Sequence, residues 1–133
     1  MRHPRFALAL ALASFAAQAT GGCVTYSQDL QRVRHHYRDS EFPQALALLR
    51  VLGDDLDALS PRERVEYAYL RGMTDFRLSE AAPAGVTRDS FRAHAQKALS
   101  LAKQLEQKTP GGLSEEERKR MHDALTALEN GTE

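Results

Sequence analysis

The chain has 133 residues, which is enough for one domain with a modest core. Its 18 basic and 18 acidic residues balance, so no net charge directs it to nucleic acid or to an acidic surface. Aromatic residues make up 7% of the chain, Trp is absent, and Ala, Leu, Arg and Glu are abundant. This composition favours helices over strands, and we expect an all-α protein that binds no nucleic acid.

The N-terminal residues have the pattern of an export signal. Residues 1–5 carry two arginines and no acid, and residues 6–17 form an apolar run interrupted only by Ser14. This run is shorter than the roughly 20 residues that a helix needs to cross a membrane. We expect residues 1–22 to be removed, which leaves residues 23–133 with 16 basic and 18 acidic side chains and a net charge of −2.

Two cleavage sites compete at the end of this signal. Residues 17–19, Ala-Gln-Ala, have the small-x-small form that general signal peptidase accepts. Residues 20–23, Thr-Gly-Gly-Cys, resemble the lipobox of bacterial lipoproteins, with Thr20 where the family usually has Leu. The resemblance implies cleavage before Cys23 and several acyl chains on the new N-terminus, which suffice for stable anchoring.

Cys23 is the only cysteine of the chain. An exposed single thiol in an oxidising compartment is a liability unless it is modified, which favours lipidation. In the alternative, cleavage after Ala19 yields a secreted periplasmic helical protein with an incidental Cys23. Val24 is not the Asp that retains enteric lipoproteins at the inner membrane, so the resemblance implies the periplasmic face of the outer membrane.

Five apolar-periodic segments follow, and each predicts a helix. Ser27 is expected to cap the first, Thr87 the fourth, and Ser60 and Ser114 open capping boxes for the third and fifth. The second, which begins at residues 41–43 and is ended by Gly53, is apolar on two faces and should therefore lie centrally. The predicted inner faces consist of Leu30, Val33 and Tyr37; Phe42, Ala45, Leu46, Leu49 and Leu52; Val65, Ala68, Tyr69, Gly72 and Phe76; Phe91, Ala95, Ala98, Ala102 and Leu105; Met121, Ala124, Leu125 and Leu128.

Two stretches resemble the tetratricopeptide repeat. Residues 36–46 are similar to the turn between its two helices, with Tyr37 as the first aromatic position. Residues 69–78 are similar to the first helix of a second repeat, with Gly72 at the small packing position and Phe76 as the counterpart of Tyr37. The resemblance implies about five antiparallel helices, arranged as helical hairpins with the fifth helix as a C-terminal cap.

In that family the inner helices line a concave groove that binds segments of other proteins. Carried over to the matching positions, the resemblance implies a partner groove. Its predicted residues are Arg34, Tyr37, Arg38, Tyr69, Met73, Phe76 and Arg77. The alternative is that the aromatic side chains among them fill the core.

Motifs of catalysis or metal binding do not stand out. The chain has no Gly-x-Ser-x-Gly elbow, no Gly-rich phosphate loop and no HExxH, and the adjacent His35 and His36 would point about 100° apart on a helix. We expect a non-enzymatic envelope lipoprotein with no cofactor besides the lipid on Cys23. It would act as an interaction or assembly module for an unidentified envelope protein; the alternative is a structural lipoprotein that associates with itself.

Overall fold

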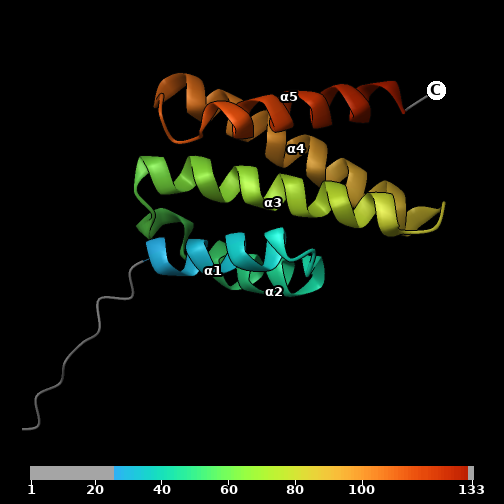
Figure 1. The fold of residues 1–133 in the computed structure, drawn as a ribbon, viewed down its shortest axis with the longest axis horizontal. Helices are drawn as coiled ribbons and strands as arrows, with labels where there is room; N and C mark the ends of the chain where they lie inside the picture. The colour runs from blue at the N-terminus through green and yellow to red at the C-terminus, as the bar shows by residue number, and fades with distance from the viewer. Residues whose placement is uncertain (1–25, 132–133) are drawn as a thin grey trace, which may run out of the picture.

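The structure is a computed structural model that describes residues 26–131, and every regular element in that range is helical (Figure 1). In chain order the elements are α1 (Tyr26–Arg38), α2 (Phe42–Leu52), the short 3₁₀ helix η1 (Gly53–Ala58), α3 (Pro61–Ala81), α4 (Val86–Lys108) and α5 (Glu115–Asn130). No strand occurs between residues 26 and 131, which confirms the all-α prediction. The predicted export signal and Cys23 lie outside the described residues.

Two helix starts follow from local side-chain capping. The Ser60 Oγ accepts a hydrogen bond from the Glu63 backbone N–H at 3.2 Å, and the Glu63 carboxylate accepts one from the Ser60 N–H at 2.8 Å. Ser114 and Glu117 form the same pair of bonds, at the same two distances, before α5. Both predicted capping boxes are confirmed; they satisfy N–H groups that a helix start leaves unpaired.

Two predicted caps are wrong. Ser27 and Thr87 lie inside the first turns of α1 and α4, which begin one residue earlier, at Tyr26 and Val86. The cap position of α4 is Gly85, whose φ of 136° is strained for any residue with a Cβ. The chain therefore enters α4 through the backbone freedom of glycine rather than through a side-chain cap.

The central helix is α3, which packs against α1, α2, α4 and α5. The prediction that α2 lies centrally is wrong, because its second apolar face is open: Val51 is 68% exposed, Ala47 is exposed and Leu48 is half-buried. Helical periodicity reports which faces are apolar but not how many neighbours a helix has. α2 packs mainly on α1 and α3, and these cover only one of its faces.

α3 and α4 form a closely packed antiparallel hairpin (Figure 1). Gly72 permits this approach, because a Cβ at that position would lie 2.6 Å from the Leu99 Cγ and 2.9 Å from the Leu99 backbone nitrogen. Leu99 is fully buried although the predicted inner face of α4 omits it. Phe91, Ala98 and Leu105 of that predicted face are only half-buried.

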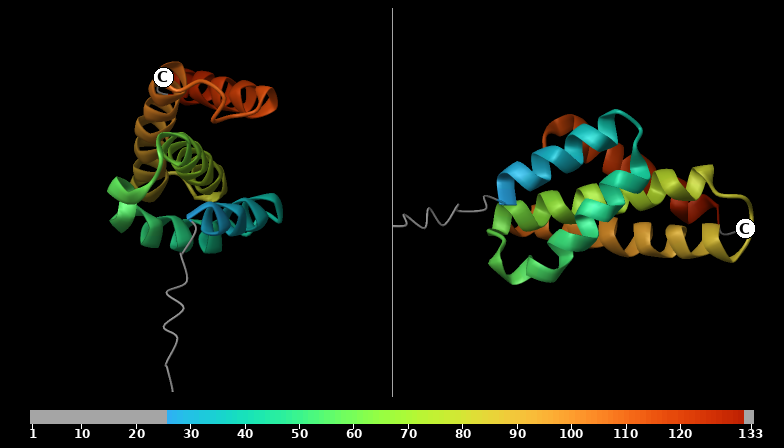
Figure 2. Two further views of the ribbon diagram at one scale, coloured as in Figure 1. Left: turned by 90° about the vertical axis from the view of Figure 1, so that its left-hand side faces the viewer. Right: turned by 90° about the horizontal axis from the view of Figure 1, so that it is seen from below.

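The turn between α4 and α5 is organised by the buried carboxylate of Glu106. It accepts hydrogen bonds from the backbone N–H groups of Gly111, Gly112 and Leu113 at 3.0–3.2 Å, and from Arg118 at 3.2 Å. These bonds fix the direction in which α5 leaves α4. In Figure 2 (left), α5 (red) and α1 (blue) lie on either side of α3, on the side away from α4.

Candidate functional site

A groove lies between α1, α3 and α5. It consists of three adjoining open hollows with volumes of about 380, 670 and 230 Å³, all bordered by Arg120. We use "the groove" for this surface, whose lining residues are Gln31, Arg34, Tyr37, Arg38, Ser40, Phe42, Tyr69, Leu70, Met73, Phe76, Arg77, Glu80, Ala81, Glu117, Arg120, Asp123 and Ala124.

The seven residues of the predicted partner groove all border this surface. Arg34, Tyr37 and Arg38 come from α1, and the other four come from α3. α2 separates these two helices in the chain, yet α1 and α3 are in contact in the fold. The structure thus brings the predicted residues together, while their binding of a partner stays a prediction.

The third wall of the groove is α5, which the sequence prediction left out. Glu117, Arg120 and Asp123 line it at intervals of three residues, a spacing that places them on one helix face. The sequence prediction treated the fifth helix only as a C-terminal cap and placed no groove residue on it. The regular spacing of polar residues was the signal that could have identified this wall.

The floor of the groove belongs to the core as well. Tyr69 is only 2% exposed and Met73 is similarly buried, whereas Tyr37 and Phe76 are half-buried. Tyr37 packs edge-on against Phe42, with ring centroids 5.5 Å apart. The two predicted alternatives, core and groove, therefore apply to different residues: Tyr69 and Met73 support the floor, and Tyr37 and Phe76 offer the accessible aromatic surface.

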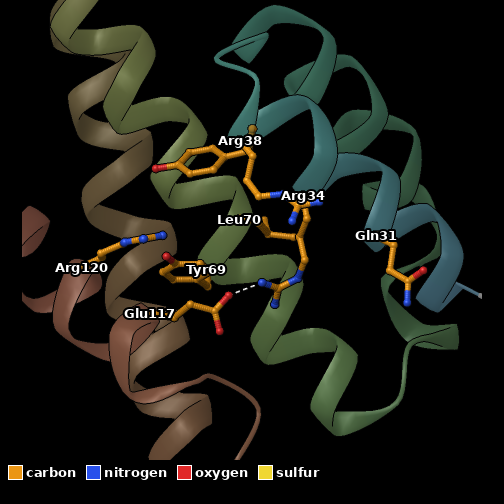
Figure 3. Close-up of a pocket in the computed structure, with 8 residues that line it drawn as sticks. Gln31, Arg34, Arg38, Tyr69, Leu70, Glu117 and Arg120 are labelled. Atoms are coloured by element: carbon orange, nitrogen blue, oxygen red, sulfur yellow. Dashed lines mark hydrogen bonds and ion pairs between the residues drawn. The ribbon is translucent and has the colours of Figure 1, made fainter.

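Arg34 joins the three helices of the groove (Figure 3). Its Nε donates a hydrogen bond to Glu66 Oε1 on α3 at 2.6 Å, and its Nη1 donates to Glu117 Oε1 on α5. In the close-up, Arg34 reaches from α1 toward Glu117 past Tyr69. This side chain thereby links the α1 wall to the α5 wall.

The pKa values of this cluster follow from burial and pairing. Burial by itself lowers the pKa of Arg34, but Glu66 and Glu117 outweigh burial and raise it above its ordinary value. Burial acts to raise the pKa of Glu117, but the Ser114 backbone N–H and Arg34 outweigh burial and lower it. Both groups are therefore charged at neutral pH, and the link is an ion pair.

Tyr69 provides a neutral floor beside these charges. Burial, with smaller contributions from Tyr37 and Glu117, raises the pKa of Tyr69 to about 12. Its hydroxyl therefore stays protonated at neutral pH. It also interacts with the guanidinium of Arg120, which reaches toward it from α5 (Figure 3).

His35 and His36 of α1 each lie close to a neighbouring carboxylate. His35 Nε2 lies 3.4 Å from Asp39 Oδ2, and His36 Nδ1 lies 2.5 Å from Glu41 Oε2. Between residues 26 and 131 no group of three or more His, Cys, Asp or Glu side chains is placed to hold a metal ion. Within the same range no helix has the length and apolar character required to cross a membrane.

Comparisons of the chain with protein-family models, with curated proteins and with solved structures found no match.

Proposed function

We propose that the protein is an envelope lipoprotein, anchored to the membrane through Cys23, whose groove binds a segment of a partner protein without catalysing a reaction. The groove is the observation that carries this proposal. Helices that are distant in the sequence place tyrosine, phenylalanine and arginine side chains on one open surface. Aromatic and arginine residues supply much of the binding energy at protein interfaces.

The order of the helices supports a tetratricopeptide-like interpretation. α1 with α2, and α3 with α4, are successive packed pairs, and the first helix of each pair lines the groove. Tyr37 and Phe76, the proposed counterparts in the two repeats, both border it. In this interpretation α5 is the capping helix, and it also completes the binding surface.

The position of Cys23 suits a short tether. Cys23 precedes Tyr26 by three residues, which span at most roughly 11 Å. A helix rises about 1.5 Å per residue, so Arg38 lies roughly 18 Å along α1 from Tyr26. Acyl chains on Cys23 would hold the Tyr26 end of α1 near the membrane and leave the Arg38 end of the groove accessible to a partner.

Mass spectrometry of the mature N-terminus, combined with membrane fractionation, tests the anchor. We expect the wild type to begin with an acylated Cys23 and to sediment with membranes. The Cys23→Ser variant should lack the acylated N-terminus, whereas the control Thr25→Ser should retain it. A wild-type chain that begins with free Thr20 would contradict the anchor.

Site-specific photo-crosslinking in the native envelope tests the groove. A crosslinker in place of Tyr37 should give an adduct with one partner protein, and a crosslinker in place of Ala47, on the exposed face of α2, should not. Adducts between two copies of the chain would favour the self-associating alternative. Equal adducts at both positions, or none, would contradict groove binding.

A further inference from the structure

The middle hollow of the groove is surrounded by arginine side chains. Arg38 of α1, Arg77 of α3 and Arg120 of α5 all line it, and Glu80 is the one carboxylate among its lining residues. We use "the arginine cluster" for Arg38, Arg77 and Arg120. Three like charges around one hollow raise its electrostatic potential, so an anion placed there lowers the free energy of the site.

The arginine cluster is available to a ligand, in contrast to Arg34. Arg77 pairs with Glu80 at 2.9 Å and interacts with the Tyr37 hydroxyl; the Arg77 and Glu80 side chains are 45% and 49% exposed. Arg120 pairs with the exposed Glu116 and interacts with the Tyr69 hydroxyl. Exposed pairs of this kind contribute little to stability, so a ligand can displace them at small cost.

Arg38 is the freest member of the arginine cluster. It is exposed at the end of α1 and forms no ion pair within residues 26–131. Arg34, one turn earlier, is already paired with two carboxylates. The two arginines therefore differ in role: Arg34 holds the walls together, and Arg38 presents an unpaired guanidinium to the hollow.

Apolar side chains adjoin the arginine cluster. The Tyr37 and Phe42 rings border the same hollow, and Met73 and Phe76 line the next one along α3. An extended peptide directs successive side chains to alternate sides. Such a segment can place a carboxylate at the arginine cluster and an apolar side chain against Phe76.

We propose that the groove binds an extended acidic segment of its partner, with Asp or Glu side chains at the arginine cluster and an apolar side chain beside Phe76. This inference rests on the proposed function and specifies the chemistry of the partner. A membrane phosphate is the less suitable anion, because Arg38 lies at the end of α1 opposite Tyr26, and the proposed anchor is at the Tyr26 end.

A peptide-display selection on the acylated mature chain in detergent micelles tests the proposal without presupposing a ligand. We expect enriched peptides that are acidic, with interspersed apolar residues. A synthetic peptide from the selection should bind about tenfold more weakly to the Arg38→Glu variant, and more weakly at high salt. The control Arg62→Glu, exposed on α3 outside the groove, should bind it like the wild type.

The outcomes separate this inference from the proposed function. Enriched peptides that are neutral or basic, yet compete for crosslinking at position 37, would overturn the acidic partner and leave the groove function standing. A selection that enriches no peptide would count against both. Binding of phosphatidylglycerol vesicles or inorganic phosphate, lost in Arg38→Glu while no acidic peptide binds, would replace the peptide with a phosphate ligand.

Discussion

Replacement of Arg34 by Met is expected to lower the free energy of unfolding by about 2 kcal/mol. Met retains much of the apolar stem but leaves Glu66 and Glu117 without their guanidinium partner. Exposed ion pairs contribute up to about 1 kcal/mol, whereas removal of one partner from a buried pair costs about 3–5 kcal/mol. The Arg34 side chain is 31% exposed and that of Glu117 is 12% exposed, so this pair lies between those limits.

Thermal unfolding followed by circular dichroism measures this loss. In a domain of this size about 1 kcal/mol corresponds to roughly 4 °C, so the midpoint of Arg34→Met should fall by about 8 °C. Arg38→Met is the matched control, since it removes an arginine from the same helix and groove but breaks no ion pair; its stability should change by less than about 0.5 kcal/mol. Equal losses in the two variants would refute the structural role of Arg34.

The same ion pair predicts how stability depends on pH. The pKa of Glu117 is lower in the folded chain than in the unfolded chain, where it is about 4.5. Its contribution is therefore present above that unfolded value and is lost as the pH falls through the folded value. The midpoint of the wild type should decrease more steeply in acid than that of Arg34→Met, and parallel profiles would contradict this.

Three further substitutions test the framework of the groove. Gly72→Ala should destabilise the fold by about 1–3 kcal/mol in denaturant titrations, although Ala favours helices, because its Cβ would meet the Leu99 backbone; an unchanged midpoint would exclude this close packing. Ser114→Ala should cost about 1 kcal/mol and speed hydrogen exchange of the Glu117 amide, and unchanged exchange would argue against the cap. Asp75→Asn should lower the midpoint at pH 7, because it removes the buried carboxylate that pairs with Arg71 at 2.9 Å. Burial raises the pKa of Asp75, so in acid the wild-type carboxyl is neutral as well and the difference should shrink; an unchanged midpoint at pH 7 would contradict the pairing.

The helices could be predicted because their signals are local. Each capping box needs only a serine and a glutamate three residues apart, and the structure contains both boxes where the sequence placed them. Ser27 and Thr87 show the limit of this reasoning. Thr87 does not cap α4 because the helix has already begun at Val86, after the non-helical backbone of Gly85.

The candidate site depends on contacts that the sequence does not encode locally. Arg34 is 32 residues from Glu66 and 83 residues from Glu117, so no spacing rule could pair them. The exposed face of α2 was unpredictable for the same reason, since it depends on which helices remain to cover it. The α1 and α3 residues of the groove could be named from the sequence only because the repeat resemblance supplied a three-dimensional register.

The walls of the groove are fixed by contacts inside the protein, and this determines how its variants should be interpreted. Glu106 fixes the turn into α5, Arg92 donates a hydrogen bond to the Leu128 carbonyl at 2.9 Å, and Arg34 links α5 to α1. A groove that is formed before its ligand arrives loses little conformational entropy on binding. Loss of the Arg38 guanidinium should therefore weaken the binding of a partner through charge alone. Loss of Arg34 should weaken that binding by loosening the contact between the α1 and α5 walls of the groove. Stability and affinity measured on the same two variants distinguish these mechanisms.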